Sequence, residues 1–222
     1  MDAINIDYRS SKLADDQVVS RVLGGQKELF EILLRRYNQT LYRVLRSYLQ
    51  DENDVKDALQ ETYLNAFSKL CQFRGDATFS TWLIRIGINQ ALQRIKLAKK
   101  HRVVNLEDEN GDLNSEHQLT DKNQMNPEKQ MIQHETSMLV EKAMDGIPEK
   151  YRIVYMLREV EGMENSQISA CLGLTESNVK VRFHRARKLL KGMLYKLSSE
   201  KEVFEFGESH CDRVVDYVMD HI

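Results

Sequence analysis

Residues 79–100 read FSTWLIRIGINQALQRIKLAKK and have the periodicity of a single helix. At about 100° per residue, the apolar side chains of this stretch gather on one broad face. Ser80 or Thr81 is placed to cap the start of the helix. A broad apolar face must be covered by other elements, so the stretch predicts the central helix of a bundle. The residues of this face are Leu83, Ile84, Gly87, Ile88, Ala91, Leu92 and Ile95.

The opposite face of the same stretch places the single tryptophan of the chain in a row of amides and cations. Its members are Trp82, Arg85, Asn89, Gln93, Lys96 and Lys100. One interpretation is a surface for unstacked nucleic-acid bases, in which the ring stacks, the amides read base edges and the cations hold phosphates. The other is an ordinary amphipathic helix with a solvated basic face and a half-buried tryptophan.

The composition favours a protein built of helices alone. The chain has 222 residues, of which 41% are hydrophobic, but only 10 glycines and 2 prolines. Few stretches alternate apolar and polar residues with the period of two that strands require. We therefore expect an all-α fold of one or two domains.

The net charge of -2 conceals a strong asymmetry along the chain. Residues 85–102 carry six Lys or Arg and no acid, and residues 176–196 carry seven bases against one acid. Between them, residues 103–130 carry seven acids against two bases. Two basic helices that flank an acidic segment indicate a nucleic-acid-binding protein more strongly than the overall charge does.

Several classes of function find no support in the sequence. Cys71, Cys171 and Cys211 are widely spaced and form no CxxC pair, which suits a reducing cytoplasm and gives no zinc framework. The polar N-terminus does not resemble a secretory signal, and no apolar run approaches the roughly 20 residues of a membrane span. Adjacent His210 and Cys211 are weak grounds for a metal site. We find no catalytic motif, so we expect neither enzymatic activity nor a cofactor.

Residues 15–100 are predicted to form a compact bundle of four helices. Asp15 or Asp16 can cap a short first helix, and Gly24 and Gly25 end it. A long second helix is expected over residues 26–49. The third helix is expected to start at Asn53 or Asp54, and the loop before the fourth contains Gly75.

The third helix carries acidic residues on the face opposite its apolar one. Asp54, Asp57 and Glu61 lie there together with Ser68, and Leu64 is placed among them. Such a face suits a partner that presents Arg or Lys around a small apolar pocket. The alternative is a solvated acidic face without a partner.

The remainder of the chain divides into three parts. Residues 101–130 are acidic, polar and without periodicity, as expected of a flexible linker. Residues 131–197 are predicted to form a second small helical domain. In the tail, residues 198–222, Val214, Val215, Val218 and Ile222 fit a short amphipathic helix that packs on the second domain or covers its DNA face.

The second domain contains the pattern of a helix-turn-helix. A short helix is expected over residues 166–172, then a turn at Gly173, a cap at Thr175 and a long helix from Glu176. Polar and basic side chains lie on the far side of the long helix, where they can enter a major groove. They are Ser177, Lys180, His184, Arg187, Lys188 and Lys191. Arg182 falls nearer the apolar edge, which favours an ion pair or a flanking phosphate over a base.

Three segments in order along the chain resemble the extracytoplasmic-function (ECF) sigma factors of bacterial RNA polymerase. They are DALQETYLNAF (57–67), QFRGDATFSTWLIRIGINQAL (72–92) and the segment 147–190 that begins IPEKYRIVYMLREVEGM. The resemblance covers about residues 15–195. It implies sigma region 2 at 15–100 and sigma region 4 at 131–197.

The resemblance implies a role for each set of side chains. Asp57, Gln60, Glu61 and Leu64 would bind the clamp helices of the polymerase β′ subunit. Trp82, Arg85, Asn89, Gln93, Lys96 and Lys100 would recognise and melt the minus-ten promoter element. Ser177, Lys180, His184, Arg185, Arg187 and Lys188 would read the minus-thirty-five element. The β flap of the polymerase and an anti-sigma factor are further implied partners.

The chain departs from the housekeeping members of that superfamily at one informative place. Arg85 and Ile86 stand where those factors carry two tryptophans. Fewer stacking groups imply weaker melting and stricter promoter choice. A competing interpretation is a free-standing helix-turn-helix regulator that binds duplex DNA without polymerase, but it accounts for neither the Trp82 face nor the acidic face at 54–68.

Overall fold

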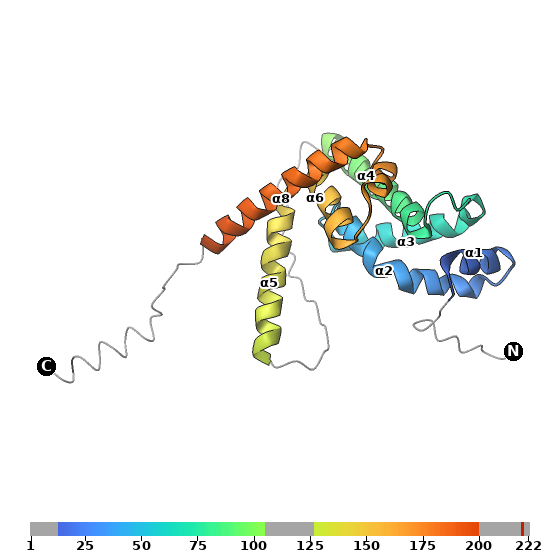
Figure 1. Ribbon diagram of the computed structural model, residues 1–222, viewed down its shortest axis with the longest axis horizontal. Coiled ribbons are helices and arrows are strands. Elements are labelled where there is room, and N and C mark those ends of the chain that lie inside the picture. Colours follow the sequence, from blue (N-terminus) through green and yellow to red (C-terminus); the bar gives the residue numbers. More distant parts are fainter. Residues whose placement is uncertain (1–12, 105–126, 200–218, 220–222) are drawn as a thin grey trace.

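The computed structural model describes residues 13–104, 127–199 and Met219, and over these residues the fold is all-α, without strands. The helices form two groups, one before and one after residues 105–126, and Figure 1 shows the two groups side by side. The predicted linker, tail and His210–Cys211 pair lie mostly or wholly outside the described residues. The fold class expected from the sequence is confirmed.

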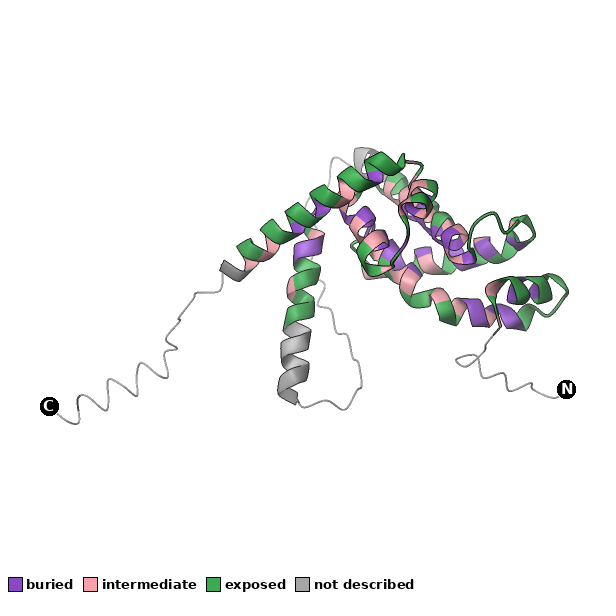
Figure 2. Ribbon diagram, viewed as in Figure 1, coloured by how far each residue is buried: buried purple, intermediate pink, exposed green. Residues whose placement is uncertain are grey.

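The first group consists of four α-helices around one core. They are α1 (Asp15–Leu23), α2 (Phe30–Arg46), α3 (Glu52–Ser68) and α4 (Phe79–Val104), with 3₁₀ turns at Lys27–Leu29 and Leu70–Gln72. Helix α4 packs against both α2 and α3. Its apolar residues Leu83, Ile84, Ile88 and Ala91 are buried, as their spacing predicts, and Figure 2 shows buried positions recurring along the helices of this group.

The helix starts differ from the expected ones by a few residues. Helix α1 is preceded by Ala14, while Asp15 lies in its first turn and bonds to Arg36 and Tyr37 on α2. Asp51 caps α3, because its Oδ1 accepts hydrogen bonds from the backbone of Asn53 at 2.9 Å and Asp54 at 3.0 Å. The predicted cap at Asp15 or Asp16 is therefore wrong, and α3 starts at Glu52, one residue before the expected Asn53.

Two further details of the first group correct the sequence-based boundaries. Thr78 caps α4 with a hydroxyl that accepts a bond from the backbone of Thr81 at 3.2 Å, so the cap is neither Ser80 nor Thr81. The helix expected over 26–49 begins as a 3₁₀ turn and ends at Arg46, after which Ser47, Tyr48 and Leu49 remain buried in the turn.

Gly87 allows α4 to lie close to α2. A Cβ at this position would lie 2.7 Å from Cδ1 of Leu41, a fully buried side chain. Gly192 on the second group is also helical, but a Cβ there would have nothing within 4 Å. Both glycines are helical, but a side chain has no room at Gly87 and has open space at Gly192.

We expect alanine at these two glycines to change stability in opposite directions. Overpacking costs about 1–3 kcal/mol, more than the roughly 1 kcal/mol that alanine gains over glycine in a helix. Gly87→Ala should therefore lower the free energy of unfolding, and Gly192→Ala should raise it by roughly 0.5–1 kcal/mol. Chemical denaturation of both variants measures this. Equal stabilisation by both would show that Leu41 moves aside freely.

The second group contains the predicted helix-turn-helix. Helix α5 (Pro127–Asp145) is followed by α6 (Glu149–Tyr155), which continues into a π-helical turn at Met156–Val160. Helices α7 (Asn165–Leu172) and α8 (Glu176–Ser199) meet at Gly173, which has the left-handed φ of 63° that ends α7. Thr175 caps α8 through a hydroxyl that accepts a bond from the backbone of Asn178 at 3.3 Å, as predicted.

The two groups share a core where α7 lies on α4. Ile168 and Cys171 of α7 and Val179 of α8 are buried in the same cluster as the core of the first group. The Sγ of Cys171 lies 3.5 Å from the backbone oxygen of Thr81, at the start of α4. We refer to this packing of the second group on the first as the closed arrangement.

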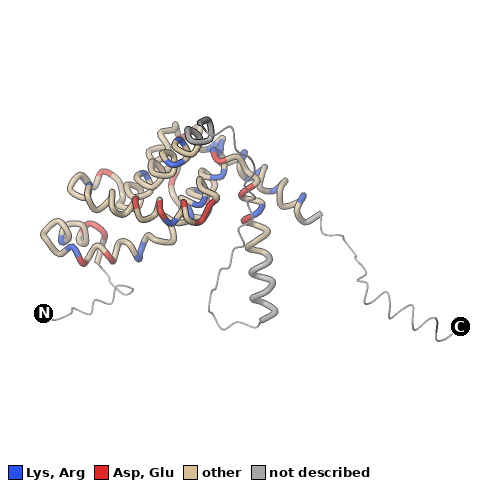
Figure 3. The backbone as a smooth tube through the Cα atoms, turned by 180° about the vertical axis from the view of Figure 1, so that it is seen from behind, with Lys and Arg blue, Asp and Glu red and all other residues tan. Residues whose placement is uncertain are grey.

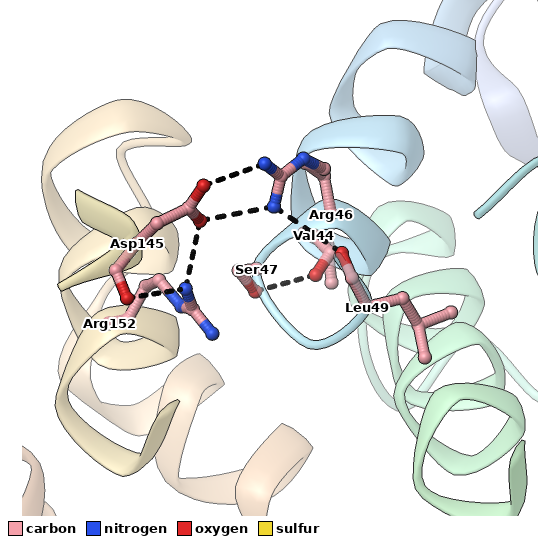
Figure 4. Close-up of polar contacts among 6 residues, drawn as sticks. All are labelled: Val44, Arg46, Ser47, Leu49, Asp145 and Arg152. Carbon is pink, nitrogen blue, oxygen red and sulfur yellow. Dashed lines mark hydrogen bonds and ion pairs between the residues drawn. The ribbon is translucent and has the colours of Figure 1, made fainter. Parts of the chain in front are cut away.

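A polar contact joins the groups at a second place, the end of α2 (Figure 4). Arg46 donates two hydrogen bonds to Asp145, at 3.1 and 2.7 Å, and the guanidinium of Arg152 donates a third at 2.9 Å. The side chain of Arg152 is only 7% exposed, and burial lowers its pKa. Asp145 therefore neutralises one cation from each group.

Candidate nucleic-acid interface

The outward face of α4 presents the side chains expected there. Arg85, Asn89, Gln93 and Lys96 are all exposed and follow one another in steps of three or four residues. Lys100 lies in the same helix, in the part whose side chains are outside the description. Amides and cations with this spacing can contact bases and phosphates along one strand of nucleic acid.

Trp82 does not stand free in this row but lies at the edge of an aromatic cluster. Its ring centroid is 5.4 Å from that of Phe73 and 5.6 Å from that of Phe79, and the residue is half-buried. Phe73 comes from the loop before α4, in which Gly75 adopts a φ of 78°. The packing fixes one side of the indole ring and leaves the rest to solvent.

The outer face of α3 exposes all four side chains expected to bind a partner. Asp57, Gln60 and Glu61 are exposed, and Leu64 among them is 71% exposed. Phe67, one turn further, is also exposed at 44%. An apolar side chain beside carboxylates can fill a pocket while the acids pair with cations around it.

One contact of this face was not predicted from the sequence. Arg94 of α4 reaches across to α3 and lies 3.3 Å from Asp54, 3.6 Å from Asp57 and 2.8 Å from Glu61. Arg94 belongs to neither the apolar nor the basic row of α4 but to the flank between them. An isolated cation on such a flank is the signal that could have predicted the contact.

Helix α8 carries Lys and Arg at several places along its length (Figure 3). The exposed members of its outward face are Ser177, Lys180, His184, Arg185, Arg187 and Lys188. Arg185 donates a hydrogen bond at 3.4 Å to the hydroxyl of Tyr151, which lowers the pKa of that tyrosine. Arg182 is half-buried close to Tyr48, so it faces the first group rather than solvent.

These surfaces are matched by family models. Residues 33–101 match the model described as Sigma-70 region 2, and residues 137–190 match Sigma-70, region 4. The RNA polymerase sigma-H factor of Pseudomonas aeruginosa is 31% identical over 190 residues, which cover 84% of this chain and 96% of that protein. The ECF RNA polymerase sigma-E factor of Escherichia coli K12 is 30% identical over 181 residues, which cover 82% of this chain and 94% of that protein.

The chain belongs to the ECF sigma factors. Proteins of this family are transcription initiation factors and not enzymes. Residues 33–101 are its region 2 and contain α3 and most of α2 and α4. Residues 137–190 are its region 4 and contain α6, α7 and most of α8.

Two solved structures share the fold of this sigma factor. The sigma factor RpoE, in co-crystal with the anti-sigma factor NepR from Bartonella quintana, superimposes with a TM-score of 0.61 at 17% identity, over 75% of this chain and 96% of that one. CnrH, in complex with the cytosolic domain of CnrY, superimposes with a TM-score of 0.55 at 23% identity, over 81% of this chain and 96% of that one. At these identities the likeness concerns the fold alone.

Two other features concern the described residues. None of their helices has both the length and the apolar character needed to cross a membrane. Their His, Cys, Asp and Glu side chains form no cluster that could hold a metal ion.

The thiol of Cys171 reports on the contact between the two regions. Burial raises its pKa to about 11, from an ordinary value of 9.0. Because a thiol reacts as thiolate, two pKa units leave about a hundredfold less of the reactive form at pH 8. We expect Cys171 to react with a disulfide reagent at least a hundredfold more slowly than exposed Cys71.

This labelling is measured on two single-cysteine variants with the other cysteines changed to serine. The reaction of Cys171 should speed up only as the pH approaches 11. Equal rates at pH 8 would mean that regions 2 and 4 are not in the closed arrangement in solution.

Proposed function

We propose that this sigma factor binds core RNA polymerase through the outer face of α3. Asp57, Gln60, Glu61 and Leu64 would contact the clamp helices of the β′ subunit. The observation that carries the proposal is the exposure of Leu64 beside these acids on region 2. An acidic surface with a protruding leucine fits a basic partner with a small apolar pocket.

The same proposal assigns promoter recognition to two helices. The α4 face with Trp82, Arg85, Asn89, Gln93, Lys96 and Lys100 would recognise and melt the minus-ten element, with a base stacked on the free side of the indole ring. The α8 face with Ser177, Lys180, His184, Arg185, Arg187 and Lys188 would read the minus-thirty-five element in the major groove. Its exposed cations support this role.

Region 4 also offers a surface for the β flap of the polymerase. A groove of about 410 Å³ between α5, α6 and α8 is lined by Leu139, Tyr155, Leu190 and Leu194. A groove of this kind suits an amphipathic helix of a partner protein. The acidic segment 101–130 would thread the polymerase cleft. An anti-sigma factor would hold the sigma factor inactive. The sigma factor would act in the cytoplasm.

The direct test mixes the purified chain with bacterial core RNA polymerase and follows both on size exclusion. Co-elution supports the proposal, and run-off transcription from a library of promoters then finds the elements that are served. If no complex forms, with the full chain or with a chain ending at Ser199, a regulator independent of polymerase becomes the better account.

Trp82→Ala is expected to slow open-complex formation about tenfold, because base stacking on an aromatic side chain contributes about 1–3 kcal/mol. Permanganate reactivity of minus-ten thymines measures the melting, and co-elution measures polymerase binding, which should stay unchanged. Because the ring is half-buried, Arg85→Ala serves as a companion variant at an exposed position of the same face. Equal loss of melting and polymerase binding in Trp82→Ala alone would indicate a structural role.

A further inference from the structure

The groove of region 4 is lined by apolar side chains and flanked by basic ones. Leu139, Tyr155, Leu190 and Leu194 form its apolar part. Arg187 and Lys191 stand along its edge, four residues apart on α8. Tyr195, 63% exposed, closes the end nearest Ser199.

The groove belongs to a small core of its own. Ala143, Met144, Ile147 and Leu190 form a buried cluster that is separate from the large core shared by the two regions. Leu194 and Tyr155 pack against this cluster and are themselves only partly buried. An additional apolar segment in the groove would therefore complete a core that the described helices leave open on one side.

The chain itself supplies a segment with the matching chemistry. Residues 200–222 follow directly on α8 and contain seven acidic residues against two Lys or Arg. At helical spacing, Val214, Val215, Val218 and Ile222 share one face. Met219, which is helical and 64% exposed, falls at the edge of that face.

The charges and the length of this segment also fit the groove. Asp212 and Asp216 are four residues apart, the same spacing as Arg187 and Lys191 on the groove edge. Residues 200–210 contain Gly207 and are long enough to reverse the direction of the chain. Residues 211–222, as a helix, would span about 18 Å and could lie antiparallel to α8.

We propose that the C-terminal segment 203–222 of this chain docks in the groove between α5, α6 and α8 of the same molecule. Its valine face covers Leu190 and Leu194, and its acids face Arg187 and Lys191. The docked segment competes with the β flap for the groove. This last consequence rests on the function proposed above, whereas the docking itself does not.

Trypsin cleavage of the full chain tests the docking without polymerase. The bond after Arg213 lies inside the docked segment and the bond after Lys201 lies before it. We expect Tyr195→Glu, Lys191→Glu and Val218→Asp each to speed cleavage after Arg213 about tenfold relative to the unaltered chain. Lys196→Glu reverses an equally exposed charge on α8 outside the groove lining and should leave the rate unchanged.

Three outcomes overturn the docking. The first is cleavage after Arg213 that is equally fast in all proteins. The second is an effect of Lys196→Glu as large as that of Lys191→Glu. The third is protection that grows with protein concentration, which would assign the groove to a second copy.

Polymerase binding separates the two proposals. Val218→Asp should bind core polymerase several-fold more tightly than the unaltered chain. If neither protein binds polymerase, the proposed function fails while protection of Arg213 still supports the docking.

Discussion

Glu61→Lys is expected to weaken binding to core RNA polymerase by about a hundredfold or more. Glu61 lies on the exposed face of α3 next to Leu64, and its carboxylate is 2.8 Å from Arg94. Truncating a central interface residue typically costs 2 kcal/mol or more, and a reversed charge adds repulsion from a basic partner. Fluorescence anisotropy of the labelled sigma factor, titrated with core polymerase, measures the loss.

Two control variants separate lost docking from lost folding. Glu141→Lys makes the same charge change at an exposed position of α5 and should bind polymerase normally. Glu61→Gln removes the charge without placing a lysine beside Arg94, so it should lose part of the affinity and keep its unfolding temperature. If Glu61→Lys binds as tightly as Glu141→Lys, the acidic face of α3 is not the docking surface.

Asp145→Ala is expected to lower the free energy of unfolding by about 3 kcal/mol. The carboxylate is the acid that pairs with Arg152, a side chain only 7% exposed. Removing one partner of a buried ion pair leaves the other charge buried without compensation, which costs about 3–5 kcal/mol. We take the lower end because Asp145 itself is 34% exposed. Urea unfolding followed by circular dichroism measures the change.

Arg46→Ala is the matched variant for the same site. It removes the cation from α2 but leaves Asp145 paired with Arg152 at 2.9 Å, so stability should fall by only about 1 kcal/mol. The contact between the two regions should loosen nevertheless, and Cys171 should react faster with thiol reagents. Equal destabilisation by Arg46→Ala and Asp145→Ala would show that the buried Arg152 does not depend on Asp145 as its partner.

The sequence predicts well those features that depend on periodicity along one helix. The buried positions of α4, the turn at Gly173 and the exposed rows of α4 and α8 all follow from the spacing of apolar and charged residues. The caps were missed by up to three residues, because several Asp, Asn, Ser and Thr side chains near each helix start could serve. Only the observed backbone geometry selects Asp51 and Thr78.

Contacts between distant segments could not be predicted from one sequence. Arg94 pairs with acids more than thirty residues away, and Arg46 pairs with Asp145 across the two regions. No periodicity within α2 or α4 distinguishes these arginines from solvated ones. The sequence could not decide whether Trp82 stacks on a base or is half-buried in the fold. Its packing on Phe73 and Phe79 depends on how the loop before α4 folds back.

The contact of α7 with α4 limits the distance between two DNA sites that regions 2 and 4 could contact at once. Promoter elements centred at minus ten and minus thirty-five are about 25 base pairs apart, which is about 85 Å of duplex at 3.4 Å per base pair. Two helices in contact, with Sγ of Cys171 3.5 Å from the backbone oxygen of Thr81, cannot span that separation. Residues 105–126 reach at most about 80 Å when fully extended. On the function proposed above, the length of chain between the regions limits the spacer that the factor can bridge, and shortening it should restrict the factor to promoters with shorter spacers.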